Sequence, residues 1–273
     1  MKVNVKAMAD AILGQVKAVY DAYPVSRRKA LMVISVGENE ASQSYIRSKE
    51  RACEYCGIPF RHIHFDDTSL NVDILCEIYK ANADKEVGGI ILQLPLPHGF
   101  DENIAQAILP EKDVDGIIKH SKFKPCTPEG VIHIMKQYFG SDLTGKEVLI
   151  IGRGKLVGEP LRKMLQDEEN CSVAVKHSKS RGQFGGIYSH DGKWDCIVSA
   201  TPEIQSELDG YYDFRLFIDC GIGRGEDGKL HGNFIPESYV ERSAVEAYTP
   251  VPGGVGPMTI AMLMFNTLAK TMK

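Results

Sequence analysis

A glycine-rich turn is the first pattern that suggests chemistry. Gly152, Arg153 and Gly154 follow an apolar run at residues 148–151, and Gly158 comes four residues after Gly154. Glycines allow a tight turn and a close approach of the backbone to a phosphate, and the amino end of a following helix presents N–H groups to a pyrophosphate. The sequence predicts both the strand before this turn and the helix after it, which is the context of a dinucleotide site. A plain glycine turn is the alternative.

The segment after the next expected strand indicates which dinucleotide would bind. It reads His177-Ser178-Lys179-Ser180-Arg181 and contains no carboxylate. NAD sites place an acidic residue here on the ribose hydroxyls, whereas a nearby cation accommodates the 2′-phosphate of NADP. With Arg153 as a further cation, the pattern favours NADP over NAD. A solvated basic loop is the competing interpretation.

Two patterns in the first half of the chain suggest substrate chemistry. Tyr45 and Lys49 are four residues apart, so on a helix they share one face and combine an aromatic ring with an amine that can carry a proton. Most such pairs, however, are solvated helix surface. Gln93 follows an apolar strand and precedes the segment LPLP. We therefore expect Gln93 at the carboxyl end of that strand, where open α/β sheets bind ligands.

Two further segments have an unusual composition. Asp113 and Asp115, in the sequence KDVDG, are expected to point to different sides, and such carboxylates can bind a metal or accept the N–H groups of a heterocycle. The segment TPVPGGVGP at 249–257 suits a close approach of the backbone to a flat ligand. Cys53 and Cys56 form a CxxC pair without the second pair that a zinc site needs, so we expect no metal site and two cysteines on a helix face. A redox or metal role for the pair is the less favoured alternative.

Alternating strands and helices are expected to position these residues. The sequence predicts strands at 30–36, 60–65, 88–92, 147–151, 172–176, 195–200 and 216–220, and helices at 5–20, 42–56, 72–81, 102–108, 128–138, 156–166 and 258–272. Asp101 is expected to cap the fourth helix and Thr127 the fifth, with Pro128 at its first helical position. A hairpin is an option for 181–193. This order predicts parallel βαβ units in two α/β halves that meet near residues 116–126.

Length and composition exclude several classes of protein. The 273 residues suggest about two domains. The net charge of −4 disfavours non-specific nucleic-acid binding, and no apolar run approaches the about 18 residues that span a bilayer. The first residues do not resemble a signal peptide. The seven scattered cysteines do not suggest a secreted disulfide framework and favour the cytosol.

The chain resembles the methylenetetrahydrofolate dehydrogenase/cyclohydrolase family in blocks from about residue 37 to residue 271. The matching blocks are ASQSYIRSKERACEYCGI, GGIILQLPLP, PEKDVDG, PCTPEG, VLIIGRGKLVGEP, IDCGI and YTPVPGGVGPMTIAML. The resemblance implies an α/β folate-binding catalytic domain over 1–122 and 251–273, a Rossmann-type NADP-binding domain over 123–250, and a cleft between them. It also implies a cytoplasmic homodimer that oxidises methylenetetrahydrofolate with NADP and hydrolyses methenyltetrahydrofolate to formyltetrahydrofolate, in one-carbon metabolism and purine biosynthesis. A member with only one activity and a non-catalytic folate-binding protein are the alternatives.

The resemblance also implies roles for individual residues. Lys49 would be the catalytic lysine, Tyr45 would stack on the folate, Gln93 would bond and tune Lys49, and Asp115 would hold the pterin. The other implied folate-site residues are Leu94, Pro252, Gly253, Gly254, Gly256 and Pro257. The implied NADP residues are Gly152, Arg153, Gly154, Val157, Gly158, His177, Ser178, Lys179, Ala200, Thr201, Cys220, Gly221 and Ile222, with Arg153 and Ser178 at the 2′-phosphate. A lysine buried beside Gln93 would have a lowered pKa, which supplies a neutral amine for the hydrolysis.

Several segments depart from the pattern of the family. Gly154 replaces the serine of the usual Gly-Arg-Ser turn, the segment at 117–124 is shorter than usual, and residues 181–193 replace an expected helix. Ala200-Thr201-Pro202 stands in place of Val-Gly-Lys-Pro, and Asn233 stands where Gly-Asp is typical. Most departures fall in the expected cofactor domain, whereas the folate residues are intact.

Overall fold

The structure is a computed structural model that describes residues 1–176, 193–201, 213–221, 223–224, 230–232 and 245–272. The chain forms two compact units. We call Ala9–Cys126 with Ile260–Lys273 the N-terminal unit, and Met1–Met8 with Thr127–Thr259 the central unit. Each unit has its own parallel sheet.

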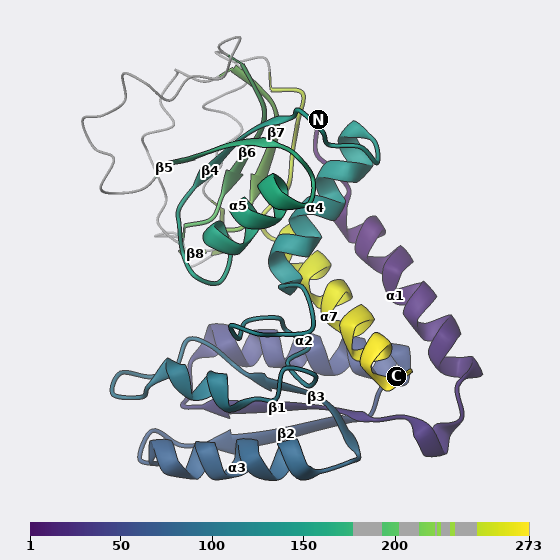
Figure 1. The fold of residues 1–273 in the computed structure, drawn as a ribbon, viewed down its shortest axis with the longest axis vertical. Helices are drawn as coiled ribbons and strands as arrows, with labels where there is room; N and C mark the ends of the chain where they lie inside the picture. The colour runs from purple at the N-terminus through teal and green to yellow at the C-terminus, as the bar shows by residue number, and fades with distance from the viewer. Residues whose placement is uncertain (177–192, 202–212, 222, 225–229, 233–244, 273) are drawn as a thin grey trace. The chain divides into compact units, whose positions relative to one another are not determined.

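The N-terminal unit is a three-stranded sheet with helices on both faces. Its elements are α1 (Val5–Ala22), η1 (Val25–Arg27), β1 (Ala30–Val36), α2 (Glu40–Cys56), β2 (Phe60–Phe65), α3 (Asn71–Ala83), β3 (Val87–Leu92) and η2 (Glu102–Ala107), together with most of α7 (Val255–Thr271). The strands lie in the order β2-β1-β3, and both pairings are parallel. Figure 1 shows α2 and α3 on opposite faces of this sheet.

The core of the N-terminal unit explains why β1 is apolar throughout. All seven residues of β1 are buried, because a central strand that is covered on both faces exposes neither set of its alternating side chains. On one face, Ile34 and Ile90 pack with Ile74 and Ile78 of α3. This burial fixes the positions at which β1 and β3 end, and therefore the place of the residues that follow them.

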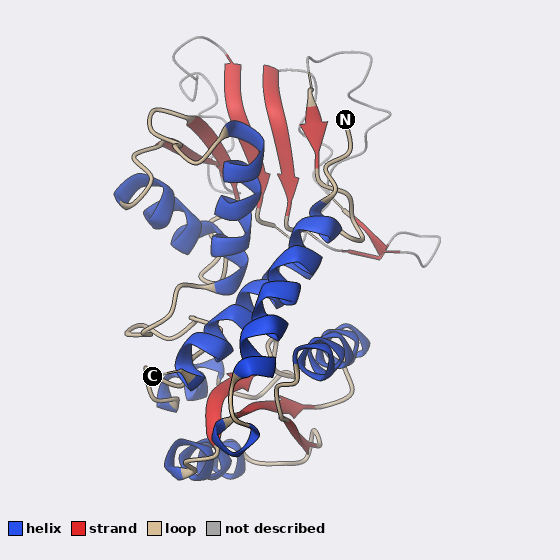
Figure 2. Ribbon diagram, turned by 90° about the vertical axis from the view of Figure 1, so that its right-hand side faces the viewer, coloured by secondary structure: helices blue, strands red, loops and turns tan. Residues whose placement is uncertain are grey.

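The central unit is a five-stranded parallel sheet of the Rossmann type. Its elements are α4 (Cys126–Phe139), β4 (Glu147–Ile151), α5 (Gly158–Asp167), β5 (Ser172–Lys176), β6 (Lys193–Ser199), β7 (Asp213–Asp219), β8 (Gly223–Arg224), β9 (Leu230–His231) and β10 (Ala247–Tyr248). The strand order is β10-β7-β6-β4-β5, with β8 and β9 forming a separate antiparallel pair. Figure 2 shows these strands beside their helices. The core includes Leu149, Ile151, Trp194, Ile197 and Phe217.

The predicted α/β fold with parallel sheets is confirmed, and three local predictions need correction. Helix α4 begins at Cys126, so Thr127 is not its N-cap and instead shares a 3.0 Å hydrogen bond with Thr259. Pro128 still fits, because N–H groups in the first turn of a helix have no partner within the helix. Asp101 caps the helix predicted at 102–108, as expected, but this helix is the 3-10 segment η2. Strand β10 was not predicted from the sequence. The hairpin suggested for residues 181–193 lies almost entirely outside the described residues.

The two cysteines of the CxxC pair lie in the core of the N-terminal unit. Cys53 and Cys56 are fully buried in α2, and their thiols contact Met264 and Leu13. The interpretation of this CxxC pair as buried on one helix face is therefore confirmed. In the described part of the chain, no helix is both long and apolar enough to cross a membrane. The same residues contain no group of three or more His, Cys, Asp or Glu side chains that could hold a metal ion.

Candidate active site

Helix α2 carries Tyr45 and Lys49 on neighbouring turns of one face. The helix begins after Asn39, whose side chain accepts the backbone N–H of Ser42 at 3.0 Å and so caps the amino end. Lys49 belongs to the buried face of the helix and is only 7% exposed. Tyr45 is half-buried. A lysine in this position must have polar partners, because an isolated buried charge is costly.

Gln93 supplies that partner from the carboxyl end of β3. Its backbone N–H donates to the carbonyl of Ile34 in β1 at 2.8 Å, which ties the residue to the sheet. The Lys49 Nζ atom donates to Gln93 Oε1 at 2.8 Å, and Gln93 Nε2 donates to the carbonyl of Leu94 at 2.8 Å. The second bond orients the side-chain amide so that its oxygen faces the lysine. The amine is thus held where open α/β sheets bind ligands.

Burial lowers the pKa of Lys49, because the ammonium form loses its hydration. The negative charge of Asp115 opposes this shift, but the net direction is downward. A lowered pKa raises the fraction of neutral amine near neutral pH. A neutral amine can accept a proton from water, which is what general-base catalysis requires.

The two carboxylates of the KDVDG segment have different surroundings. Asp113 is fully buried and accepts the backbone N–H of Ile118 at 3.0 Å, so it stabilises the local turn. Burial raises the pKa of Asp113. Asp115 is half-buried and lies close enough to Lys49 to affect the pKa of its amine. Of the two, Asp115 is therefore the carboxylate available to a ligand beside Lys49.

Cys126 and Asn266 belong to this cluster and were not predicted as site residues. Cys126 is 1% exposed, and its thiol donates to the carbonyl of Val114 at 3.3 Å. Burial and the neighbouring Asp115 raise the pKa of Cys126, so it remains a thiol. Asn266 Nδ2 donates to the same carbonyl at 3.0 Å and to the sulfur at 3.5 Å. The block PCTPEG could have indicated Cys126, whereas Asn266 stands 140 residues further along the chain, in a helix that the sequence analysis treated only as apolar.

The glycine turn of the central unit is tightly packed at two of its glycines. Gly152 has a φ of 105°, and a Cβ atom there would meet the carbonyl oxygen of Ala200 at 2.5 Å. Helix α5 begins at Gly158, two residues later than predicted, and a Cβ atom there would collide with the carbonyl of Gly152. Gly154, in contrast, faces open space within 4 Å. The N-cap of α5 is Val157, and no side chain caps this amino end.

The remaining predicted NADP residues divide into described and undescribed positions. Ala200 and Thr201 follow β6 next to Gly152, and Cys220 and Gly221 follow β7. These four residues come at the carboxyl ends of adjacent parallel strands, as a Rossmann cofactor site requires. Arg153 is exposed in the turn. The predicted residues His177, Ser178, Lys179 and Ile222 lie outside the described residues.

The predicted folate segment at 252–257 also lies in the central unit. A cis peptide bond joins Val251 to Pro252, and Gly253 has a φ of 96°. A Cβ atom at Gly253 would meet no other atom within 4 Å, so this backbone is open to a ligand. Gly256 and Pro257 lie in the first turn of α7.

Together, the fold and these residues define a class of protein, an α/β enzyme with a Rossmann-type nucleotide-binding unit and a buried lysine. Comparisons with known families narrow this class. Residues 3–115 match the catalytic domain of the tetrahydrofolate dehydrogenase/cyclohydrolase family, and residues 125–273 match its NAD(P)-binding domain. The chain belongs to this family. It is therefore a methylenetetrahydrofolate dehydrogenase and methenyltetrahydrofolate cyclohydrolase, an oxidoreductase and hydrolase of one-carbon metabolism.

Individual relatives agree with this assignment. The bifunctional protein FolD of Staphylococcus aureus is 40% identical over 250 residues, which cover 87% of this chain and 84% of the relative. FolD of Geotalea uraniireducens is 37% identical over 275 residues, covering 96% and 95%. The crystal structure of FolD from Campylobacter jejuni superimposes with a TM-score of 0.89 at 34% identity, over 100% of this chain and 98% of that one. The family predicted from the sequence blocks is confirmed.

Proposed function

We propose that this chain oxidises methylenetetrahydrofolate with NADP and hydrolyses the methenyl product to formyltetrahydrofolate, with Lys49 carrying the protons of the hydrolysis. The observation that supports this assignment is the 2.8 Å hydrogen bond from Lys49 to Gln93, made by an amine that is only 7% exposed. Family membership gives the two reactions, and this geometry supports Lys49 as the group that handles protons.

The folate is bound by residues of several elements. Asp115 accepts N–H groups of the pterin, because a carboxylate is an acceptor that matches two adjacent donors. Tyr45 stacks its ring on the flat heterocycle one helical turn from Lys49. Leu94 and the segment at 252–257 line the rest of the folate site, where glycine backbone allows close approach.

The oxidation depends on orientation more than on acid–base chemistry. NADP supplies the hydride acceptor when it is bound. The protein holds the one-carbon bridge of the folate in place, and proximity of this kind contributes much of the rate. No side chain has to remove a proton in this step, so Lys49 is not needed for the transfer itself.

The residues of the central unit fit NADP. Gly154 leaves open space in the turn, and no side chain caps α5. The N–H of Glu159 donates to the carbonyl of Gly154 at 3.1 Å, and Pro160 has no N–H. The N–H of Gly158 is therefore the group at this helix end that would meet a pyrophosphate. Arg153 is proposed as the cation that binds the 2′-phosphate of NADP, and Ser178 as a second partner of the same phosphate. Ala200, Thr201, Cys220 and Gly221 line the carboxyl ends of the strands. The related enzyme of Trypanosoma brucei was crystallised with NADP, which supports the same cofactor here.

The hydrolysis uses the neutral amine of Lys49. As water adds to the methenyl carbon, a new C–O bond forms and Lys49 accepts the proton that the water loses. The resulting ammonium then gives this proton to the leaving nitrogen as the C–N bond breaks. The hydroxyl group on the same carbon releases its proton to solvent as the C=O bond forms, so the hydrolysis of the methenyl cation releases one proton overall. Gln93 keeps the amine in place through both transfers, since its oxygen accepts a hydrogen bond from either protonation state.

The broader organisation is also part of this proposal. We assign residues 1–122 and 251–273 to the folate-binding domain and 123–250 to the NADP-binding domain. The compact units support a division into two parts, but the central unit also includes Met1–Met8 and residues 251–259. The protein is a cytoplasmic homodimer, and its formyl product feeds purine biosynthesis. Light scattering of the purified chain tests the dimer.

A coupled assay tests the proposed function. Methylenetetrahydrofolate is added with NADP or NAD, and the absorbance of the methenyl product is followed as it forms and decays. We expect formation with NADP and decay faster than the uncatalysed rate. If the methenyl product forms but does not decay faster than the uncatalysed rate, the protein is a dehydrogenase only. If added methenyltetrahydrofolate decays faster but no methenyl product forms from methylenetetrahydrofolate, the protein is a cyclohydrolase only.

A further inference from the structure

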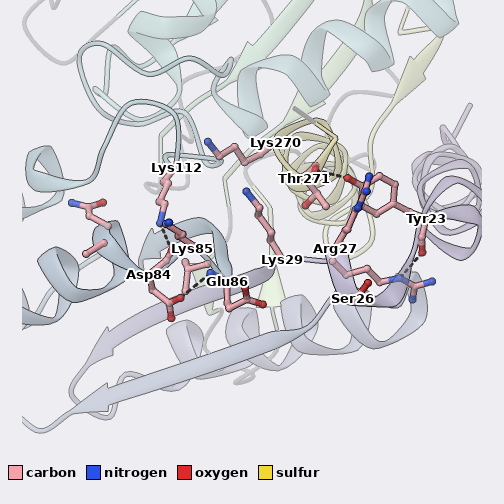
Figure 3. A pocket seen from close by; sticks show the side chains of 14 residues that line it. Tyr23, Ser26, Arg27, Lys29, Asp84, Lys85, Glu86, Lys112, Lys270 and Thr271 are labelled. Atoms are coloured by element: carbon pink, nitrogen blue, oxygen red, sulfur yellow. Dashed lines mark hydrogen bonds between the residues drawn. The ribbon is translucent and has the colours of Figure 1, made fainter.

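A hollow lined by basic side chains lies at the amino ends of β1 and β3. Its volume is about 540 Å³, and its lining comes from the residues just before these two strands, from the end of α7 and from Lys112 (Figure 3). Gln93 follows the carboxyl end of β3, so the Lys49–Gln93 pair lies at the opposite end of the strands of the same sheet. The hollow is therefore separate from the proposed catalytic residues.

The lining carries a strong excess of positive charge. It contains six cationic side chains, those of Arg27, Arg28, Lys29, Lys85, Lys112 and Lys270, but only two carboxylates, those of Asp84 and Glu86. The formal excess is four positive charges, in a chain whose net charge is −4. Asp84 is also paired with Arg61 at 2.7 Å, so part of its charge is already compensated from outside the hollow.

Three lysines of the lining affect one another. Lys112 is 8% exposed, and its ammonium donates to the carbonyls of Ala81 and Asp84 at 2.8 and 2.6 Å. An ammonium has three donors, so one N–H remains for another acceptor. Burial lowers the pKa of Lys112; the negative charge of Asp84 opposes this shift, and the positive charges of Lys270 and Lys29 add to it. Figure 3 shows the side chains of Lys29 and Lys270 extending into the space beside Lys112.

Helix ends explain only part of this charge. Helices α3 and α7 end at the hollow, and the carbonyls at a helix carboxyl end attract cations. Lys112 satisfies that attraction at α3. Within the described part of the chain, however, the side chains of Arg27, Lys29 and Lys85 form no hydrogen bond or ion pair. Their charges are available to a ligand.

We propose that this hollow binds a small organic ligand that carries two or more phosphate groups. Ammonium groups bind phosphate as point charges, and guanidinium groups bind it with paired hydrogen bonds. Two phosphate monoesters carry about three to four negative charges, which matches the excess of the lining. The volume falls within the range of about 300–1,000 Å³ that is usual for small-molecule sites. A bound phosphate would also relieve the repulsion among Lys29, Lys112 and Lys270.

Calorimetric titration with inorganic tripolyphosphate tests this proposal. The protein is titrated without NADP, because NADP itself carries several phosphate groups and would compete for the hollow. The titration uses the Arg153→Ala variant, in which the glycine turn of the central unit has lost its exposed cation and binds the probe weakly. We expect one tripolyphosphate per chain, with an affinity that falls as salt is added, because screening weakens charge pairing. Absence of saturable binding at low salt would overturn the proposal.

Matched variants locate the bound probe. The double variant Lys29→Gln with Lys270→Gln should weaken binding at least tenfold, whereas Lys80→Gln with Lys119→Gln removes the same charge elsewhere and should change it less than twofold. Lys85→Gln, an exposed position, gives a second test if the first pair reduces thermal stability, and it should weaken binding about threefold to tenfold. Equal loss in the control pair, or none in the lining variants, would refute the site. Citrate binding as tightly as tripolyphosphate would refute phosphate as the ligand class.

Discussion

Lys49 combines two properties that rarely occur together, deep burial and a single oriented polar partner from another element. Replacing it with methionine, which has a similar length but no amine, removes the proton carrier and leaves the packing of α2 largely intact. Lys49→Met should therefore lower the cyclohydrolase kcat by about 10²- to 10⁴-fold, the usual contribution of general acid–base catalysis. Hydride transfer should persist in part. The coupled assay measures both, and full cyclohydrolase activity in this variant would contradict the assignment.

Gln93 offers a test of the protonation state. In the native enzyme we expect the cyclohydrolase rate to rise with pH as Lys49 loses its proton, and burial, which lowers the pKa of Lys49, moves this rise to lower pH than a free lysine would give. Gln93→Glu puts a carboxylate against the ammonium, which favours the charged form and raises the pKa of Lys49. The rising part of the pH profile should then move to higher pH by about one to two units, with about 10- to 100-fold less activity at pH 7. An unmoved profile would rule out Lys49 as the titrating base.

Asp115 is expected to act in binding. Asp115→Ala removes the carboxylate that we propose accepts hydrogen bonds from the pterin, and a hydrogen bond to a charged group is worth about 1.5–3 kcal/mol. The folate affinity should fall about 10- to 150-fold for both reactions together. Measured KM values for the two activities check this. A loss confined to one reaction would show instead that Asp115 takes part in the chemistry.

At the scale of elements, the connection from β4 to α5 places opposite demands on two glycines. A Cβ atom at Gly158 would collide with the backbone of Gly152, whereas Gly154 faces open space. Gly158→Ala should therefore shift the amino end of α5 and raise the NADP KM about tenfold or more, with a loss of thermal stability. Gly154→Ala is the matched control and should change the NADP KM by less than about threefold. Equal effects of the two substitutions would argue against this geometry.

At the scale of the whole molecule, cofactor preference should be visible in stability as well as in rate. A ligand that binds only the folded protein stabilises it by about 2.7 kcal/mol at a concentration of 100 times its Kd. We expect NADP to raise the melting temperature more than the same concentration of NAD. Arg153→Ala should remove most of this difference and raise the NADP KM about 10- to 150-fold, since it deletes the proposed charged partner of the 2′-phosphate. Equal shifts with NAD and NADP in the unmodified protein would contradict the predicted preference.

Local rules in the sequence identified most elements but not their limits. The apolar runs of β1 and β3 predicted buried parallel strands, since only strands covered on both faces are apolar throughout. The amino ends of α4 and α5 were misplaced by two residues. In α4, Thr127 and Pro128 lie inside the first turn. Helix α5 begins at a glycine, and no side-chain cap marks its start. The two-residue strand β10 was missed, since its pairing with β7 rather than its composition makes it a strand.

For the site, the sequence by itself determined the residue types and the family. Spacing placed Tyr45 and Lys49 on one helix face, and the blocks around Gln93 and Asp115 identified the chemistry. Only the tertiary structure decided that Lys49 donates to Gln93, since these residues lie 44 positions apart and meet because α2 packs beside the end of β3. The lowered pKa of Lys49 likewise depends on burial, which is a property of the packed core. The basic hollow joins residues from four separate parts of the chain, and no local pattern reveals such a collection, because their proximity exists only after the sheet and α7 have assembled.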